Sequence, residues 1–119
     1  MQEKATMLIV DDVEINRVIL TQFFKNDYII IEANNGREAL NIIEKQPVNI
    51  VLLDLVMPVM DGFELLSILK SNAAYAEIPV IVMTARNEGD SEVRAMEMGA
   101  ADFIKKPYNP TIVSCRVRN

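Results

Sequence analysis

Short runs of apolar residues alternate along the chain with longer segments in which apolar residues recur every three or four positions. An uninterrupted apolar run is typical of a strand that is buried on both faces, whereas the longer period is typical of a helix with one buried face. Strands that alternate with helices predict a parallel sheet built from repeated strand–helix units. The predicted strands lie at about residues 5–10, 28–33, 48–53, 79–84 and 102–105.

A segment with helical spacing follows each predicted strand. The apolar residues expected to face the sheet are Ile15, Val18, Ile19 and Phe23 in the first helix, Ala39, Leu40 and Ile43 in the second, Phe63, Leu66 and Leu69 in the third, and Val93 and Met96 in the fourth. The fourth helix, at about 88–98, is the most weakly apolar, so few buried contacts would oppose its displacement.

The length of 119 residues predicts a single domain, which can bury about two thirds of its unfolded surface. The fifth helix begins at about Asn109, and the chain stops within it, with no capping residue after Val117. We therefore expect residues 1–119 to be one domain whose last helix is cut from a longer protein. A stand-alone domain with a short last helix is the alternative.

Composition narrows the range of functions. Half of the residues are hydrophobic, but no apolar run approaches the ~20 residues that cross a bilayer, and the N-terminus lacks the order of a signal peptide. We expect a cytoplasmic domain without a membrane segment. The one cysteine, Cys115, cannot form an internal disulfide, and we expect it to be a small packing residue.

The net charge of −5 argues against nucleic-acid binding by this domain, because phosphate contacts need clustered Lys and Arg. The chain has no histidine, which excludes histidine-based acid–base catalysis and makes a zinc site implausible. Any phosphohistidine that reacts with this chain would have to belong to another protein or domain.

Three carboxylates are predicted to meet at one edge of the sheet. Asp11 and Asp12 follow the first apolar run directly, and Asp54 follows the third. In an open parallel sheet, ligands collect outside the carboxyl ends of the strands. Like charges this close repel, or one takes up a proton, unless a cation shares the site. A hard cation with oxygen ligands, such as Mg²⁺, fits these residues.

The order of the polar residues resembles that of the receiver domain of two-component response regulators. An acidic pair follows the first strand, and Asp54 with the phrase MPVMDG follows the third. Thr84 follows the fourth strand, and the fifth strand is followed by Lys105-Lys106-Pro107. The resemblance covers essentially the whole chain. It implies an α/β fold of the flavodoxin-like, doubly wound kind, with a five-stranded parallel sheet of order 2-1-3-4-5 and five helices on its two faces.

The same resemblance assigns roles around Asp54, which would attack phosphorus and become an aspartyl phosphate. Asp12 and Asp54 would bind Mg²⁺ directly, Asp11 would act mainly through bound water, and the backbone carbonyl of Val56 would complete the protein ligands. Mn²⁺ is expected to substitute for Mg²⁺. Taken alone, an Asp after a strand is more often a helix cap or turn residue.

Further roles follow from the resemblance. Lys106, the lysine next to proline, would bring positive charge to the phosphoryl group, while Lys105 would point away as a solvated charge. Thr84 would donate its hydroxyl to a phosphoryl oxygen, and its movement would leave space into which Phe103 turns. Val56 and Arg86 flank the path of a hydrolytic water in this family. Neither side chain can accept a proton, so we expect slow loss of phosphate.

The predicted function is that of a phosphoacceptor in a phosphorelay. It would take a phosphoryl group from a histidine kinase or phosphotransfer protein and control an output domain or protein through its fourth helix, fifth strand and fifth helix. A homodimer is left open. Catalysis would be self-directed, so the domain is not predicted to be a turnover enzyme.

Three other classes of protein share some of these features. The first is a degenerate receiver that only makes protein contacts. The second is a haloacid-dehalogenase-like phosphatase, which would want a second Asp where Val56 stands. The third is a flavodoxin, which would need a phosphate loop after the first strand.

Overall fold

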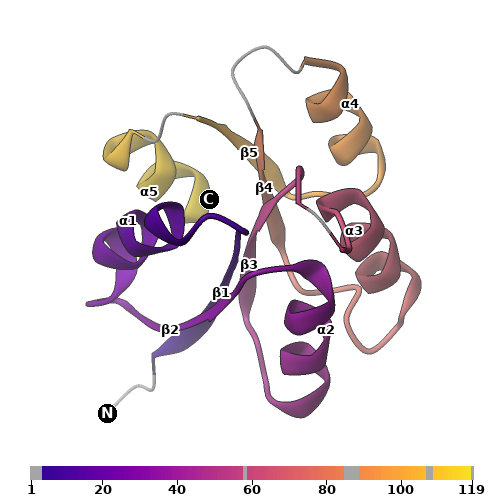
Figure 1. The fold of residues 1–119 in the computed structure, drawn as a ribbon, viewed down its shortest axis with the longest axis horizontal. Helices are drawn as coiled ribbons and strands as arrows, with labels where there is room; N and C mark the ends of the chain where they lie inside the picture. The colour runs from indigo at the N-terminus through magenta and orange to yellow at the C-terminus, as the bar shows by residue number, and fades with distance from the viewer. Residues whose placement is uncertain (1–3, 58, 85–88, 107–108, 119) are drawn as a thin grey trace.

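Five parallel strands form the centre of the molecule in the computed structural model, which describes residues 4–57, 59–84, 89–106 and 109–118. The strand order is β2-β1-β3-β4-β5, which confirms the predicted topology (Figure 1). The strands are β1 (Ala5–Val10), β2 (Tyr28–Ala33), β3 (Ile50–Asp54), β4 (Val80–Thr84) and β5 (Asp102–Lys105). All five therefore end at the same edge of the sheet.

The predicted strand positions are correct to within two residues, and the largest difference lies in β3. This strand begins at Ile50 instead of residue 48 and includes Asp54. Asp54 pairs with Met83 in the ladder, and the N–H of Leu55 still donates to the carbonyl of Met83. The backbone of Asp54 is therefore fixed by strand pairing and does not belong to an unpaired loop.

Helices cover both faces of the sheet (Figure 1). One face carries α1 and α5, and the other carries α2, α3 and α4. Their bounds are α1 (Glu14–Phe24), α2 (Gly36–Lys45), α3 (Gly62–Ser71), α4 (Gly89–Glu97) and α5 (Pro110–Arg118). Because successive side chains of a strand point to opposite faces, Leu8 and Val10 of β1 join one core, while Met7 and Ile9 join the other.

The predicted inner face of α1 is partly wrong: Phe23 packs against the core, but two of the predicted residues face solvent. Ile15 is 59% exposed and Val18 is also exposed, whereas Leu20 and Phe24 are the buried residues. Apolar residues occur around most of this helix, so helical spacing alone allowed more than one inner face. The face that packs on the sheet carries Leu20 and Phe24, two large residues that lie four positions apart.

The predicted inner face of α4 is also wrong, since Val93 and Met96 are exposed and Ala95 is buried. The small side chain of Ala95 lets the helix backbone approach β4 and β5 closely. Cys115, expected to be a small packing residue, is exposed on α5. Within the described parts of the chain, no helix combines the length and apolar character that crossing a membrane requires.

Candidate phosphoacceptor site

Asp54 lies at the end of β3, where the chain turns into α3. The turn is tight: a Cβ added at Gly62 would lie 2.5 Å from the carbonyl oxygen of Asp54, so only glycine fits without movement. The N–H of Gly62 donates to the carbonyl of Leu55, and the Asp61 side chain accepts from the N–H of Glu64 as the helix cap. These contacts fix the backbone on both sides of the loop that starts at Asp54.

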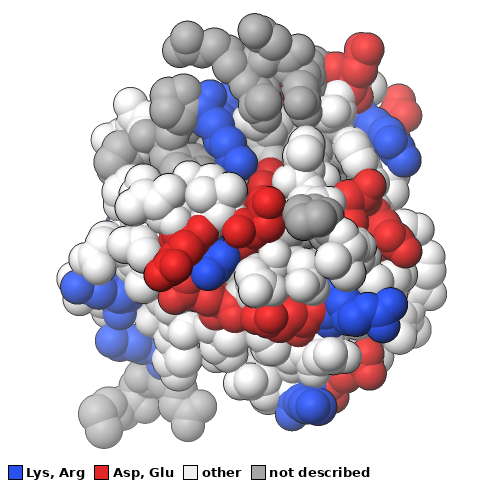
Figure 2. Space-filling view, viewed as in Figure 1, with Lys and Arg blue, Asp and Glu red and all other residues white. Residues whose placement is uncertain are grey.

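The three predicted carboxylates do meet at this edge. Oxygens of Asp11, Asp12 and Asp54 all lie within 4.8 Å of one another. Asp11 is fully buried and Asp54 is 4% exposed, while Asp12 faces solvent. Figure 2 shows acidic side chains gathered near the middle of this face, with a basic side chain among them and further Lys and Arg side chains around them.

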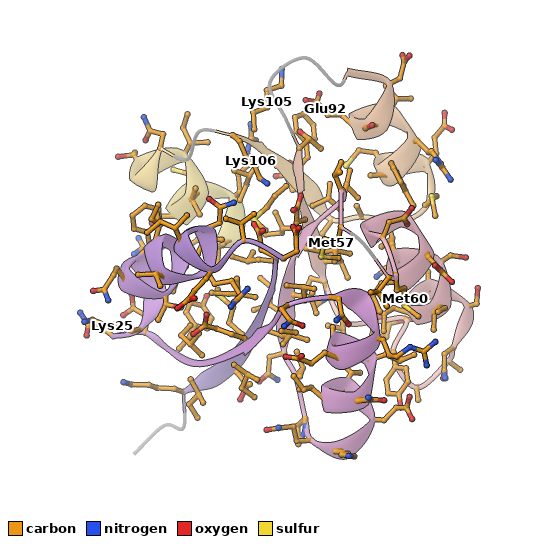
Figure 3. All side chains as sticks on the ribbon, viewed as in Figure 1. Lys25, Met57, Met60, Glu92, Lys105 and Lys106 are labelled. Atoms are coloured by element: carbon orange, nitrogen blue, oxygen red, sulfur yellow. The ribbon has the colours of Figure 1, made fainter. Side chains whose placement is uncertain are left out.

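Lys106 is the cation of the cluster. Its Nζ lies 3.3 Å from Oδ1 of Asp54 and 3.8 Å from Oδ2 of Asp11. The N–H of Lys106 donates to the carbonyl of Thr84, which extends the pairing of β4 and β5 by one residue. Lys105 points elsewhere, as expected from alternation, and its exposed Nζ lies 3.6 Å from Oε1 of Glu92 (Figure 3).

The surroundings of Asp54 disfavour its charged form. Burial and the neighbouring Asp11 carboxylate raise the pKa of Asp54 from 3.8 to about 6, although Lys106 and the N–H of Val56 act in the opposite direction. One lysine therefore does not balance the acidic groups of this site. A shared divalent cation would do so, and carboxylate oxygens are the ligands that Mg²⁺ prefers. The donor set fits such an ion.

Arg17 supports the loop that carries the acidic pair, and the sequence did not reveal it. Its guanidinium donates to the carbonyl oxygen of Asp11 at 2.7 Å and to Glu32 of β2 at 3.1 Å. Asp11 also accepts from the N–H of Val13 through its side chain. Asp11 therefore has a fixed backbone and a fixed side chain before any ligand binds.

Thr84 is buried at the end of β4, next to the strand that carries Asp54. Its hydroxyl donates to Oε1 of Glu92 at 3.4 Å. Glu92 was not predicted as a site residue. It comes from α4, and no local motif marks a contact across the β4–α4 connection, which lies outside the described residues.

Phe103 is half-buried on β5 and packs against the core that α2, α3 and α4 cover. The guanidinium carbon of Arg116 lies 5.9 Å from the centre of its ring, and Arg116 also pairs with Asp102 at 3.6 Å. Val56 is 64% exposed beside Asp54, and its N–H donates to Oδ1 of Asp54 at 3.3 Å. Arg86, the other predicted modulator, lies outside the described residues.

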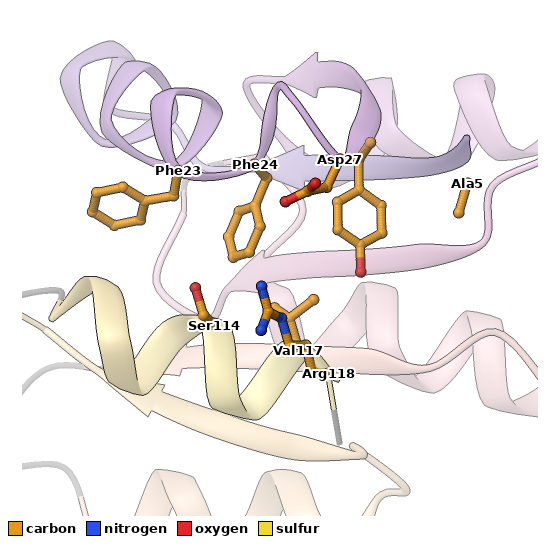
Figure 4. Close-up of a pocket in the computed structure, with 8 residues that line it drawn as sticks. Ala5, Phe23, Phe24, Asp27, Ser114, Val117 and Arg118 are labelled. Atoms are coloured by element: carbon orange, nitrogen blue, oxygen red, sulfur yellow. The ribbon is translucent and has the colours of Figure 1, made fainter. Parts of the chain in front are cut away.

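A groove of about 440 Å³ lies at the opposite edge of the sheet, between the end of α1 and α5 (Figure 4). Its lining includes the edge-on rings of Phe24 and Tyr28, together with Asp27 and Arg118. It has no cluster of carboxylates within the described part of the chain, so the acidic edge is the candidate site.

The fold and the acidic edge define a signalling domain that accepts a phosphoryl group. Residues 7–118 match the family model of the response regulator receiver domain, and the chain belongs to this family. The resemblance seen in the sequence is thereby confirmed.

Curated relatives contain the same domain in different contexts. The chain is 36% identical to Response regulator GtcR of Aneurinibacillus migulanus over 95% of this chain and 46% of that protein. It is also 36% identical to Histidine kinase P4 of Formosa agariphila, over 99% of this chain and 9% of that protein. The chain thus spans less than half of the length of these relatives.

Solved structures agree with the fold. A putative response regulator from Chloroflexus aurantiacus superposes with a TM-score of 0.95 at 28% identity, covering 98% of this chain and 97% of that chain. The chemotaxis protein CheY4 of Vibrio cholerae superposes with a TM-score of 0.90 at 26% identity, covering 98% of both chains.

Proposed function

We propose that Asp54 is the phosphoacceptor of this receiver domain. The observation that carries the proposal is the position of Asp54: a buried carboxylate at the carboxyl edge of the sheet, within 4.8 Å of Asp11 and Asp12 and 3.3 Å from Lys106. An aspartate that follows a strand is more often a helix cap or a turn residue. Here the cap of α3 is Asp61, and the local contact of the Asp54 side chain is the N–H of Val56 at 3.3 Å.

The proposed reaction transfers a phosphoryl group from a phosphohistidine of a kinase or phosphotransfer protein. An oxygen of Asp54 forms a bond to phosphorus while the bond from phosphorus to the donor nitrogen breaks, and the imidazole leaves with that electron pair. Mg²⁺, held by Asp12, Asp54 and the Val56 carbonyl with Asp11 acting through water, would supply charge stabilisation, and Mn²⁺ would substitute. Lys106 already pairs with Asp54 and would follow the charge onto the phosphoryl oxygens.

We propose Thr84 and Phe103 as the residues that report phosphorylation. Thr84 has a hydroxyl proton to donate and lies at the end of β4, which pairs with the strand of Asp54, β3. Phe103 lies on β5, which pairs with β4, and its ring is partly buried. Movement of Thr84 toward the phosphoryl group would let Phe103 turn inward and change the surface of α4, β5 and α5.

The proposed docking surface for the donor is the start of α1. Val13, Ile15 and Val18 are exposed apolar residues in the segment that follows Asp11 and Asp12. Three exposed apolar side chains beside an acidic site support contact with a partner helix. A cytoplasmic location agrees with this partner and with the exposed thiol of Cys115.

The proposed output surface is formed by α4, β5 and α5, where Val93, Met96 and Ile112 are exposed. An output domain, another protein or a second copy of the chain would bind there. We propose no turnover reaction: self-phosphorylation and loss of the phosphoryl group are the chemistry of this domain, with no nucleic acid or membrane as its own partner.

The test is magnesium-dependent labelling by acetyl phosphate, followed by intact mass measurement. We expect one added phosphoryl group in wild type and in Asp27→Asn, an exposed control at the other edge of the sheet. We expect none in Asp54→Asn or after removal of Mg²⁺ by a chelator. Equal labelling of Asp54→Asn would overturn the assignment, whereas a folded wild type that takes up no phosphoryl group would favour a receiver that makes only protein contacts.

A further inference from the structure

Glu92 connects the acidic edge to α4. Its side chain is 12% exposed, and its Oε1 contacts both the hydroxyl of Thr84, at 3.4 Å, and Nζ of Lys105, at 3.6 Å. Figure 3 places Glu92 near Lys105 at the end of the sheet where Lys106 also lies. A nearly buried carboxylate needs such partners, because leaving its charge unpaired would be costly.

The other described contacts of α4 are few. Ala95 is its buried hydrophobic residue, whereas Val93 and Met96 are exposed. Arg94 stacks on the ring of Phe63 of α3 at 4.0 Å. With so little apolar burial, the polar contact between Glu92 and Thr84 is one of the few described contacts that fix this helix against β4.

We infer that Glu92 is a positioning residue that holds the Thr84 hydroxyl toward α4 and thereby opposes phosphorylation. The inference rests on the proposed function, in which Thr84 donates to a phosphoryl oxygen. A hydroxyl carries a single proton, so Thr84 donates either to Glu92 or to the phosphoryl group. Phosphorylation must therefore break the contact with Glu92.

The coupling is reciprocal. If the phosphoryl group draws Thr84 away from Glu92, then loss of the Glu92 carboxylate must favour the state that binds the phosphoryl group. The same exchange removes one of the contacts that fix α4, so phosphorylation weakens the attachment of α4 to β4. Lys105 remains as the partner of Glu92, so the carboxylate is not left unpaired when Thr84 moves.

The experiment measures the affinity of the metal-bound protein for beryllofluoride, an analogue of the phosphoryl group, by titration calorimetry in excess Mg²⁺. We expect Glu92→Ala to lower the dissociation constant about three- to tenfold, the fold-change that corresponds to the net contribution of a typical single hydrogen bond. Glu92→Gln keeps an uncharged acceptor and should shift it less. Glu97→Ala, which removes an exposed carboxylate from the same helix, should leave it unchanged.

A double-mutant cycle with Thr84→Ala separates this role from a general effect of charge or helix stability. We expect Glu92→Ala to have no effect on the dissociation constant when the Thr84 hydroxyl is absent. An equal shift in that background, or no shift in the presence of Thr84, would overturn the inference while leaving the proposed function intact. A folded wild type that does not bind beryllofluoride would overturn both.

Discussion

Nζ of Lys106 lies 3.3 Å from Oδ1 of Asp54, yet the pKa of Asp54 is raised to about 6. Burial outweighs the lysine, and the Asp11 carboxylate adds to the effect of burial. Without a bound cation, the site is therefore short of positive charge. The site therefore favours binding of a cation or a proton. The resulting change in the free energy of unfolding can be measured without any phosphodonor.

The stability of the metal-free protein should fall as pH rises from about 4.5 to 7.5. The folded pKa of Asp54 is above the unfolded value of 3.8, so its stabilising contribution is present below that value and is lost as pH passes through about 6. The loss should be on the order of 2 kcal/mol. Urea denaturation in the presence of a chelator measures it.

Other groups also titrate in this range, so the comparison is with Asp54→Asn. The difference in unfolding free energy between wild type and this variant should change with pH in the stated direction. A difference that is constant between pH 4.5 and 7.5 would show that the environment of Asp54 does not favour its protonated form.

Asp12→Ala should weaken Mg²⁺ binding without lowering metal-free stability. Asp12 is exposed and adds a negative charge to the site of Asp11 and Asp54, which already has excess negative charge. Its removal therefore relieves repulsion between carboxylates. The matched control is Asp61→Ala, which should cost ~1 kcal/mol through loss of the α3 cap and leave metal affinity unchanged. Thermal unfolding with and without Mg²⁺ gives both quantities. A large metal-free loss in Asp12→Ala would make Asp12 a structural residue.

Val59→Asn should stabilise the protein by about 1 kcal/mol, because Val59 has a φ of 65°, where a β-branched residue is strained and Asn is tolerated. Val59 is 69% exposed, so little packing is lost. Val56→Asn is the control: this residue is also exposed, but it has no positive φ. Equal melting temperatures for wild type and Val59→Asn would argue against strain at this position.

The strands were predicted within two residues because each is a short apolar run bounded by polar residues or proline, and burial on both faces requires such a run. The acidic edge followed from the same reasoning, since parallel strands end together. The strand order came from the resemblance, because apolar runs do not state which strands are neighbours.

The helix faces and the contact of Glu92 were not predictable in the same way. In α1 the choice between Ile15 and Leu20 depends on how the helix lies on the sheet. Glu92 lies eight residues after Thr84 and meets it only because α4 folds back over β4. A sequence pattern reports period and propensity, while these contacts depend on the path of the connecting loop.

The side chains that flank the path of the hydrolytic water are expected to set the lifetime of the phosphoryl group. The side chain of Val56 is exposed beside Asp54 and cannot hydrogen-bond a water that attacks phosphorus. The side chain of Arg86 offers only donors. Phosphate loss should therefore be slow in wild type. The double variant Val56→Asn/Arg86→Glu adds an amide and a carboxylate that can orient the water and accept its proton, and it should lose phosphate on the order of tenfold faster.

The decay is followed by intact mass after the phosphodonor is removed, with Val59→Asn as the control in the same loop. This control should decay at the wild-type rate, because Val59 is not among the residues expected to flank the water. Decay of the double variant at the wild-type rate would show that positions 56 and 86 do not govern the lifetime. Backbone groups around Asp54 would then have to orient the water, and the slow loss would need another cause.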